Sequence, residues 1–206
     1  MHSNVVKFVP FSKKQKQVLT WWTDASPHKN KSAIIADGAV RSGKTRSMSL
    51  SYIFWSMSTF SGCNFGMAGK TIASFRRNVW NDLVPTLKRR GYRISKVPEL
   101  HDAYYIQKGR VRNAYYIFGG HDEKSQDIVQ GITCAGFFFD EVALMPQSFV
   151  NQAVARCSIE GSKLWFNCNP DGPKHWFKLE WIDQLERQNA LHIHFTMDDN
   201  PSLSPK

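Results

Sequence analysis

Hydrophobic residues follow two kinds of spacing along this chain. Spacings of three to four positions predict helices over residues 12–22, 43–60, 71–90, 146–156 and 173–188. Short apolar runs between them predict buried strands at residues 33–37, 63–68, 136–140, 163–168 and 191–196. Helices that alternate with buried strands indicate a three-layer α/β fold with a mainly parallel central sheet.

Residues 103–119 depart from this alternation. Two tyrosine-rich runs, YYIQKG and AYYIF, flank a glycine-containing turn. This pattern predicts an antiparallel hairpin, inserted in the sheet or added at its edge, with its arginines exposed.

Length and composition narrow the class of protein. The 206 residues suit one domain, spanning residues 1–206, and are too few for two full domains. With 42% hydrophobic and 21% charged residues, the chain is not a disordered tail or a fibre. No apolar run approaches the roughly 20 residues that span a bilayer, and the first residues lack the apolar core of a secretion signal. We therefore expect neither a membrane protein nor a secreted one.

The charge balance points to a polyanionic partner. The net charge of +10 favours nucleic acid, although a basic charge alone also suits a domain that is merely soluble. Within the predicted helix 71–90, cations gather near both ends, at Arg76, Arg77, Lys88, Arg89 and Arg90. These residues either follow the phosphates of double-stranded DNA without reading its sequence or form a solvated helix face, and both interpretations stay open.

The strongest motif is GAVRSGKT at residues 38–45, which fits G-x-x-x-x-G-K-[ST] and directly follows an apolar run. Glycines let such a phosphate-binding loop (P-loop) curl so that backbone N–H groups face phosphate oxygens, and the next helix adds its positive end. Here Lys44 would reach the outer phosphates of a nucleotide, and Thr45 would hold Mg²⁺. The predicted nucleotide-binding residues of the loop are Gly38, Ala39, Val40, Arg41, Ser42, Gly43, Lys44 and Thr45.

A second motif, Asp140 and Glu141 after the apolar run GFFF, supplies the carboxylates that a P-loop needs. Asp140, at the strand tip, would hold Mg²⁺, and Glu141 would orient and polarise the attacking water. The alternative is a solvated acidic turn. Arg41 also has two interpretations, because it would either contact the terminal phosphate or only add positive potential to the loop.

Together these motifs resemble those of the large terminase subunits, the ATP-driven motors that package DNA into tailed-phage capsids. Residues 38–45 are similar to that family's arginine-bearing Walker A motif, residues 139–141 to its Walker B motif with a catalytic glutamate, and residues 166–170 to its coupling motif. FSKKQ, at residues 11–15, resembles the adenine-recognising segment, and residues 199–201 resemble the segment that closes the motor domain.

The resemblance implies a P-loop ATPase of the additional-strand, catalytic-glutamate division. Glu141, Arg41 and Lys44 would be catalytic. Gln15 would read the adenine edge, and Asn169 would couple hydrolysis to movement, although asparagine before proline is also a common turn residue. The implied reaction is Mg-ATP hydrolysis that drives double-stranded DNA into a procapsid. The implied partners are further copies of the chain in a ring, the portal protein and the small terminase subunit, and the implied location is the host cell cytoplasm and, transiently, the procapsid portal.

Two features depart from the family. Relatives often carry a cation directly before Gly131, where this chain has Gln130, so Arg156 is the substitute candidate. Arg156 would either complete the site of a neighbouring subunit in trans or pair with a nearby acid. The chain also stops where family members continue into a C-terminal nuclease domain, so we expect an excised motor domain without DNA cleavage.

Two other functions stay open. A nucleotide-dependent docking module would bind a portal or small-subunit partner with little turnover, and the presence of both Lys44 and Glu141 argues against it. A DNA helicase or repair ATPase would share the same core and would separate the strands of a forked duplex.

Overall fold

One eight-stranded sheet forms the centre of the protein, with the strand order β3-β4-β5-β2-β6-β7-β1-β8. The computed structural model describes residues 10–98, 100, 102–169 and 172–202. The strands are β1 (Ala33–Gly38), β2 (Asn64–Gly69), β3 (Arg93–Lys96), β4 (Ala103–Lys108), β5 (Val111–Gly119), β6 (Gly136–Phe139), β7 (Lys163–Asn167) and β8 (Ala190–Phe195). All neighbours from β5 across to β8 are parallel, whereas β4 is antiparallel to both β3 and β5. The predicted mainly parallel sheet is confirmed.

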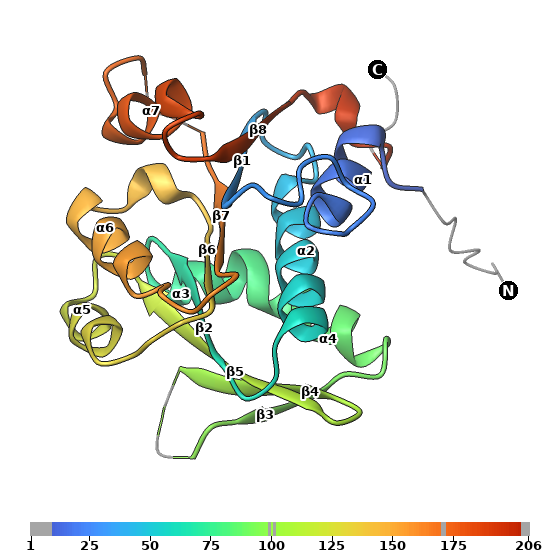
Figure 1. Ribbon diagram of the computed structural model, residues 1–206, viewed down its shortest axis with the longest axis vertical. Coiled ribbons are helices and arrows are strands. Elements are labelled where there is room, and N and C mark those ends of the chain that lie inside the picture. The colour runs from blue at the N-terminus through green and yellow to red at the C-terminus, as the bar shows by residue number, and fades with distance from the viewer. Residues whose placement is uncertain (1–9, 99, 101, 170–171, 203–206) are drawn as a thin grey trace, which may run out of the picture.

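Helices cover both faces of this sheet (Figure 1). One face carries α1 (Lys13–Thr20), α2 (Lys44–Thr59), α3 (Ile72–Phe75) and α4 (Asn81–Lys88), and the other carries α5 (Glu123–Gln130), α6 (Gln147–Ala155) and α7 (Trp176–Glu180). Each layer has its own core, one around Trp21, Tyr52 and Trp165 and the other around Phe137 and Phe166. The predicted three-layer α/β fold is therefore confirmed.

Strand β7 lies between β1 and β6, the two strands that lead into the P-loop and into Asp140. β1 pairs with β7 through Ala36 opposite Asn167, and β6 pairs with β7 through Phe139 opposite Phe166. This interposed strand is the additional strand that the resemblance implied. It carries the residues after Phe166 to the same edge of the sheet as the P-loop.

A ladder of phenylalanine rings fixes where these strands end. Phe118 stacks on Phe137, Phe137 on Phe139, and Phe139 on Phe166, with ring centroids 5.5, 4.5 and 5.0 Å apart. All four side chains are buried, and burying such a ring stabilises the fold by about 2 kcal/mol. Because Asp140 and Asn167 directly follow the last rings of β6 and β7, the ladder holds both polar residues at the carboxyl edge of the sheet.

The predicted hairpin forms the far end of the sheet. β4 and β5 are its two strands, and Arg110 and Arg112 are exposed as expected. β3, which the sequence analysis did not predict, adds an outer strand to the hairpin. Its sequence RISK contains one apolar residue, Ile94, so it lacks the apolar run of a buried strand. We call β3, β4 and β5 the sheet extension.

Two predicted helices differ from those observed. The helix over 71–90 is a run of α3, a π-helical turn at Arg76–Trp80 and α4. The helix over 173–188 is wrong in extent, because only α7 and a 3-10 turn at Ile182–Gln184 form there. Helix α5, mostly polar in sequence, was not predicted. Within the described ranges, no helix combines the length and the apolar character needed to cross a bilayer.

Candidate nucleotide-binding site

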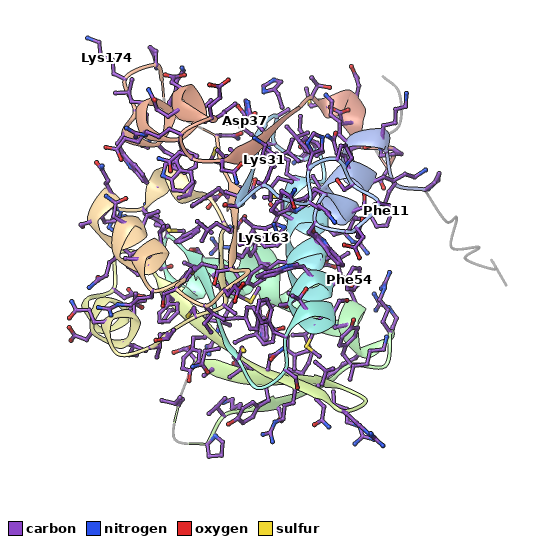
Figure 2. The ribbon with its side chains drawn as sticks, in the orientation of Figure 1. Phe11, Lys31, Asp37, Phe54, Lys163 and Lys174 are labelled. Carbon is purple, nitrogen blue, oxygen red and sulfur yellow. The ribbon has the colours of Figure 1, made fainter. Side chains whose placement is uncertain are left out.

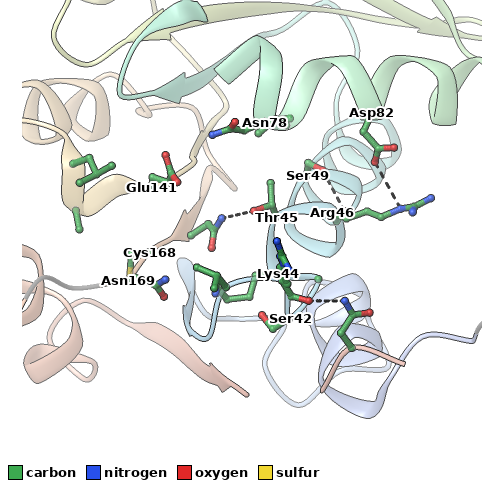
Figure 3. Close-up of a pocket in the computed structure, with 18 residues that line it drawn as sticks. Ser42, Lys44, Thr45, Arg46, Ser49, Asn78, Asp82, Glu141, Cys168 and Asn169 are labelled. Carbon is green, nitrogen blue, oxygen red and sulfur yellow. Dashed lines mark hydrogen bonds and ion pairs between the residues drawn. The ribbon is translucent and has the colours of Figure 1, made fainter. Parts of the chain in front are cut away.

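The P-loop, the acids after β6 and the residues after β7 meet at the carboxyl edge of the parallel strands, beside a cavity of about 650 Å³. Residues 40–45 of the P-loop, Glu141, and the three residues Asn167, Cys168 and Asn169 line it. Arg46 and Asp82, which form an ion pair of 3.8 Å, lie across the cavity from Glu141 and Asn169 (Figure 3). Such a volume is ordinary for a small-molecule site.

Two glycines give the P-loop its shape. Gly38 has φ 106°, and a Cβ there would collide with the carbonyl oxygen of Phe195 in β8. Gly43 has φ 83° and caps the start of α2, and a Cβ there would collide with the side chain of Gln15. Both positions combine a left-handed backbone with a close approach, which only glycine tolerates without strain.

Lys44 lies over the start of the loop. Its Nζ donates hydrogen bonds to the carbonyl oxygens of Gly38 and Ala39, each at 2.7 Å. The residue is 7% exposed, and burial lowers the pKa of Lys44 below its ordinary value. The ammonium is thus held in a position from which it reaches into the cavity.

Asn167 bonds the two residues predicted to hold Mg²⁺. Its Nδ2 donates to Thr45 Oγ1 at 2.8 Å and to Asp140 Oδ1 at 2.6 Å, and Thr45 Oγ1 lies 3.4 Å from the same carboxylate oxygen. Burial raises the pKa of Asp140 to about 6, against the hydrogen bond from Asn167, which lowers it. The sequence analysis missed Asn167, whose signal was an asparagine that ends an otherwise apolar strand.

The oxygen atoms Thr45 Oγ1 and Asp140 Oδ1 are ligands that suit a hard divalent cation such as Mg²⁺. Among the described residues, no group of three or more histidine, cysteine, aspartate and glutamate side chains is placed to hold a metal. Mg²⁺ does not need such a group, because it keeps several waters and takes one or two protein oxygens together with substrate phosphates. Asn167 Oδ1 is buried beside Thr45 and Asp140 and has no hydrogen-bond partner among the described residues.

Glu141 sits directly after β6 with φ 57°, a left-handed conformation that is uncommon outside glycine. This conformation starts the 3-10 turn Val142–Leu144 and turns the chain out of the strand direction. The side chain is exposed and lines the cavity. It therefore stands where a carboxylate contacts water as well as a bound ligand.

Arg41 and Asn169 both line the cavity and are exposed. Arg41 also has a left-handed backbone, φ 61°, and its carbonyl oxygen accepts a hydrogen bond from Asn200 Nδ2. Asn200, which also lines the cavity, was not predicted to act there. Of the two asparagines after Phe166, Asn167 is the one bonded to Thr45 and Asp140, and Asn169 lies on the exposed side of the cavity.

Gln15 lies under the P-loop and not on its open side. It is 6% exposed, its Oε1 accepts from Ser12 N–H as part of a capping box, and its Nε2 donates to the Ser42 carbonyl at 3.3 Å. Both polar atoms are thus engaged, Oε1 in the cap of α1 and Nε2 in support of the loop. Its reading of an adenine edge stays a prediction.

Asp37, the last residue before Gly38, is a further charged group near the loop (Figure 2). One of its carboxylate oxygens lies 2.9 Å from His192 Nε2 and 3.0 Å from His194 Nδ1. Burial raises the pKa of Asp37, but the two histidines together lower it below its ordinary value. Asp37 therefore stays ionised next to the P-loop.

Arg156 lies at the other edge of the sheet. Its carbonyl accepts from Cys134 N–H, which precedes β6, whereas Asp140 and Glu141 follow that strand. Arg156 is exposed and does not line the cavity, so it cannot act in the site of its own chain. A role in a neighbour's site stays a prediction.

The five cations proposed for DNA contact are not equivalent. Arg76 donates to Asp102 Oδ1 at 2.5 Å and to the Tyr104 hydroxyl, so this arginine is held by an acid. Arg77 is exposed and donates to Asn78, a neighbour that lines the cavity. Lys88, Arg89 and Arg90 are exposed at the opposite end of the helical run.

The fold and the site together define a P-loop NTPase with an additional strand between its two motif-bearing strands. Residues 35–206 match the family described as terminase large subunit, T4likevirus-type, N-terminal. The chain therefore belongs to this family, and it corresponds to the family's N-terminal domain. Comparison with curated proteins gives no match.

Solved structures support the same assignment. The large terminase of a thermophilic bacteriophage is 60% identical, with a TM-score of 0.92 over 95% of this chain and 48% of that one. Two further structures of that terminase, one with ADP (60% identity, TM-score 0.89) and one with ATP-gamma-S (58%, 0.88), cover 95% of this chain and 48% and 47% of theirs. This chain spans about half the length of the thermophilic phage protein. The ATPase domain of the Thermus phage P74-26 large terminase shares the fold at 13% identity and a TM-score of 0.62, over 91% of this chain and 86% of that one.

Proposed function

We propose that this domain binds Mg-ATP in the cavity and hydrolyses it, as the motor domain of a terminase large subunit that moves double-stranded DNA into a procapsid. The observation that carries the proposal is the contact of Asn167 with Thr45 and Asp140 beside a cavity that Glu141 lines. The thermophilic phage terminase, which is known in complex with ADP and with ATP-gamma-S, supports the choice of nucleotide.

Each residue of the site has a role that its geometry supports. Lys44 and the backbone N–H groups of the loop bind the phosphates, with the N-terminus of α2 behind them. Thr45 and Asp140 hold Mg²⁺, which when bound neutralises charge on the transferred phosphoryl group. Glu141 accepts a hydrogen bond from a water and orients it toward the terminal phosphate.

Arg41 and Asn169 act from the open side of the cavity. Arg41 places a guanidinium near the outer phosphates, where it stabilises charge that develops in the transition state. Asn169 follows Asn167 by two residues, so a shift of Asn167 when the phosphate leaves is passed to this loop. This connection is the proposed coupling of hydrolysis to movement.

The proposed assembly is a ring of several copies, in which Arg156 of one subunit approaches the cavity of the next. The proposed partners are the portal protein, the small terminase subunit and duplex DNA. The proposed location is the host cell cytoplasm, with transient docking at the procapsid portal. The exposure of Arg156 and its place outside its own cavity support a role between subunits.

The test is ATP turnover by the 206-residue chain over a range of protein concentrations, with and without duplex DNA. Glu141→Gln should lower turnover by about 10²- to 10⁴-fold and leave Mg-ATP binding intact. The matched control is Glu160→Gln, an exposed acid that does not line the cavity. A rate per molecule that rises with concentration supports sites shared between subunits.

Two outcomes would replace the proposal. Equal and negligible turnover by wild type and Glu141→Gln at every concentration, with Mg-ATP still bound, would make the domain a nucleotide-dependent docking module. ATP-dependent separation of a forked duplex would make it a helicase-type motor.

A further inference from the structure

Eight lysine and arginine residues lie on or beside the sheet extension, and all of them are exposed: Lys88, Arg89, Arg90, Arg93, Lys96, Lys108, Arg110 and Arg112. The same stretch, residues 88–112, contains two acids, Glu99 and Asp102. Asp102 is paired with Arg76, outside the stretch. None of the eight cations forms an ion pair with any carboxylate in the described parts of the chain. Their charge is therefore not neutralised by any carboxylate of the described residues.

Strand register brings these cations together. Arg93 in β3 lies opposite Gln107 in β4, and Gln107 lies opposite Arg112 in β5, so the three side chains share one face. Neighbouring strands are about 4.8 Å apart, which places the Cα atoms of the two arginines about 10 Å apart. The turn that contains Arg110 joins β4 to β5 at the same end of the extension. Figure 2 shows nitrogen-tipped side chains projecting into solvent from this end of the molecule.

Aromatic rings, and not acids, hold two of these side chains. The Arg112 guanidinium carbon lies 3.6 Å from the centroid of the Tyr105 ring, and Lys108 Nζ lies 4.6 Å from that of Tyr92. A ring face orients a cation and leaves its charge in place, whereas a carboxylate would cancel it. The extension thus presents positive charges that are positioned in advance and remain available to an anion.

Protection of a sheet edge explains only part of this pattern. Charged residues on an outer strand discourage pairing with another chain, and Arg93 and Lys96 of β3 serve that purpose. Lys108 and Arg112 lie on strands that are paired within the sheet, and Arg110 lies in the turn. Their charge needs another explanation.

The sheet extension also lies away from the nucleotide cavity. β5 begins at Val111 and runs parallel to β2, so the turn before it is at the amino edge of the parallel strands, and the cavity is at their carboxyl edge. A strand of six residues is about 20 Å long, which separates the two surfaces. A long ligand on the extension would leave the cavity free for nucleotide exchange.

We propose that the sheet extension is a docking surface for the sugar-phosphate backbone of duplex DNA, with Arg93, Arg110 and Arg112 as its principal contacts. The proposal rests on the proposed motor function and names the surface with which the motor domain would contact duplex DNA. Guanidinium groups match phosphate in geometry and charge, and contacts of this kind do not depend on base sequence. Arg76, which is already paired with Asp102, lies outside this surface.

The test measures binding of a fluorescently labelled 30-base-pair duplex by anisotropy at several salt concentrations. The variant Arg93→Gln, Arg110→Gln, Arg112→Gln should bind at least about tenfold more weakly at low salt, and its salt dependence should fall by about 0.9 per lost phosphate contact. The control is Lys13→Gln, Lys16→Gln, Arg187→Gln, which removes three exposed positive charges elsewhere. It should bind within about twofold of wild type. Arg→Lys at the three extension positions keeps the positive charge that releases counterions, so most of the affinity should remain.

Equal weakening by the two triple variants would overturn the proposal, because only net charge would then matter. Tighter binding of a single-stranded 30-mer than of the duplex would also overturn it. Wild type that turns over ATP but binds no duplex would overturn this proposal alone, whereas wild type that binds duplex but not ATP-gamma-S would overturn the proposed function alone. Thermal melting of each variant confirms that it is folded.

Discussion

The charged side chains at the two edges of the central sheet differ in burial and in their partners. At the carboxyl edge, Asp140 is buried and hydrogen-bonded to Asn167, and Lys44 is buried and bonded to the carbonyls of its own loop. At the amino edge, the cations of the sheet extension are exposed, and the Arg112 guanidinium lies over a tyrosine ring. The carboxyl edge thus holds buried polar groups in place by hydrogen bonds, whereas the amino edge exposes its charged groups to solvent.

The contrast agrees with the ligands proposed for the two edges. A small nucleotide must be held within fractions of an ångström for chemistry to occur, so its site needs buried groups whose positions are fixed by neighbouring hydrogen bonds. A long polyanion offers the same phosphate repeatedly, so its surface needs positive charge and tolerance of sliding. A substitution at one edge should therefore leave ligand binding at the other edge unchanged.

The largest expected effect is at the buried lysine. Lys44→Met should weaken ATP-gamma-S binding by at least about 100-fold, because it removes a charge held among the loop carbonyls. Duplex binding should not change. Calorimetry with ATP-gamma-S measures the effect, and Lys108→Met, at the other edge, is the matched control. A similar loss of nucleotide affinity in both variants would contradict the separation of the two edges.

The next effect concerns the two asparagines after Phe166. Asn167→Ala should lower ATP turnover by about 30-fold, since it removes the donor that Thr45 and Asp140 share and leaves a buried carboxylate without its partner. Asn169→Ala should have a smaller effect. Steady-state kinetics on the two variants decides between them, and a larger loss for Asn169→Ala would show that turnover depends more on Asn169 than on the contact of Asn167 with Thr45 and Asp140.

The buried carboxylate of Asp140 should lower the stability of the folded chain at neutral pH. Its pKa is raised to about 6, so above that pH the buried carboxylate is ionised at a cost in folding free energy, and the cost disappears as the pH falls from 6 toward 3.8. In EDTA at pH 7, Asp140→Asn should therefore stabilise the chain by on the order of 2 kcal/mol, about 4–8 °C in Tm.

Thermal melting at pH 7 and pH 5 checks this prediction. The gain should shrink at the lower pH, and the exposed Asp127→Asn should show no gain at either. A gain that is equal at both pH values would mean that ionisation of Asp140 is not its source.

The smallest effect is expected at the extension. Arg112→Gln and Tyr105→Leu should each change the free energy of unfolding by less than about 1 kcal/mol, and a double-mutant cycle should give a coupling of about 0.5–1 kcal/mol. Urea denaturation measures both. A coupling much larger than this would show that the pair holds the fold together and is not simply poised for a ligand.

Much of the nucleotide site was predictable because its signals are local. The P-loop spacing and the acids after GFFF each lie within one short segment, and each element that carries them was predicted nearly to its observed ends. The role of Asn167 was not predictable in this way. Its contact with Thr45 depends on β7 lying beside β1, a pairing of segments more than 120 residues apart.

The misjudged parts of the fold share a physical cause. β3 is an outer strand with one apolar residue, Ile94, and α5 has two, Ile128 and Val129, so the spacing of apolar residues gave no signal for either. The pairing of Arg76 with Asp102 likewise depends on the tertiary structure, since one residue lies in the π-helical turn and the other just before β4. Charge counts alone placed that arginine with its exposed neighbours.

The P-loop is held by segments from both ends of the described chain. The Ala39 N–H donates to Phe195 in β8 at 2.9 Å, and Gln15 of α1 donates to the Ser42 carbonyl. Protection of an amide from hydrogen exchange reports the opening of the partner that it bonds. Hydrogen exchange of the Ala39 amide should therefore report the detachment of β8 from the sheet. This one proton of the P-loop would thus measure the dynamics of the edge strand.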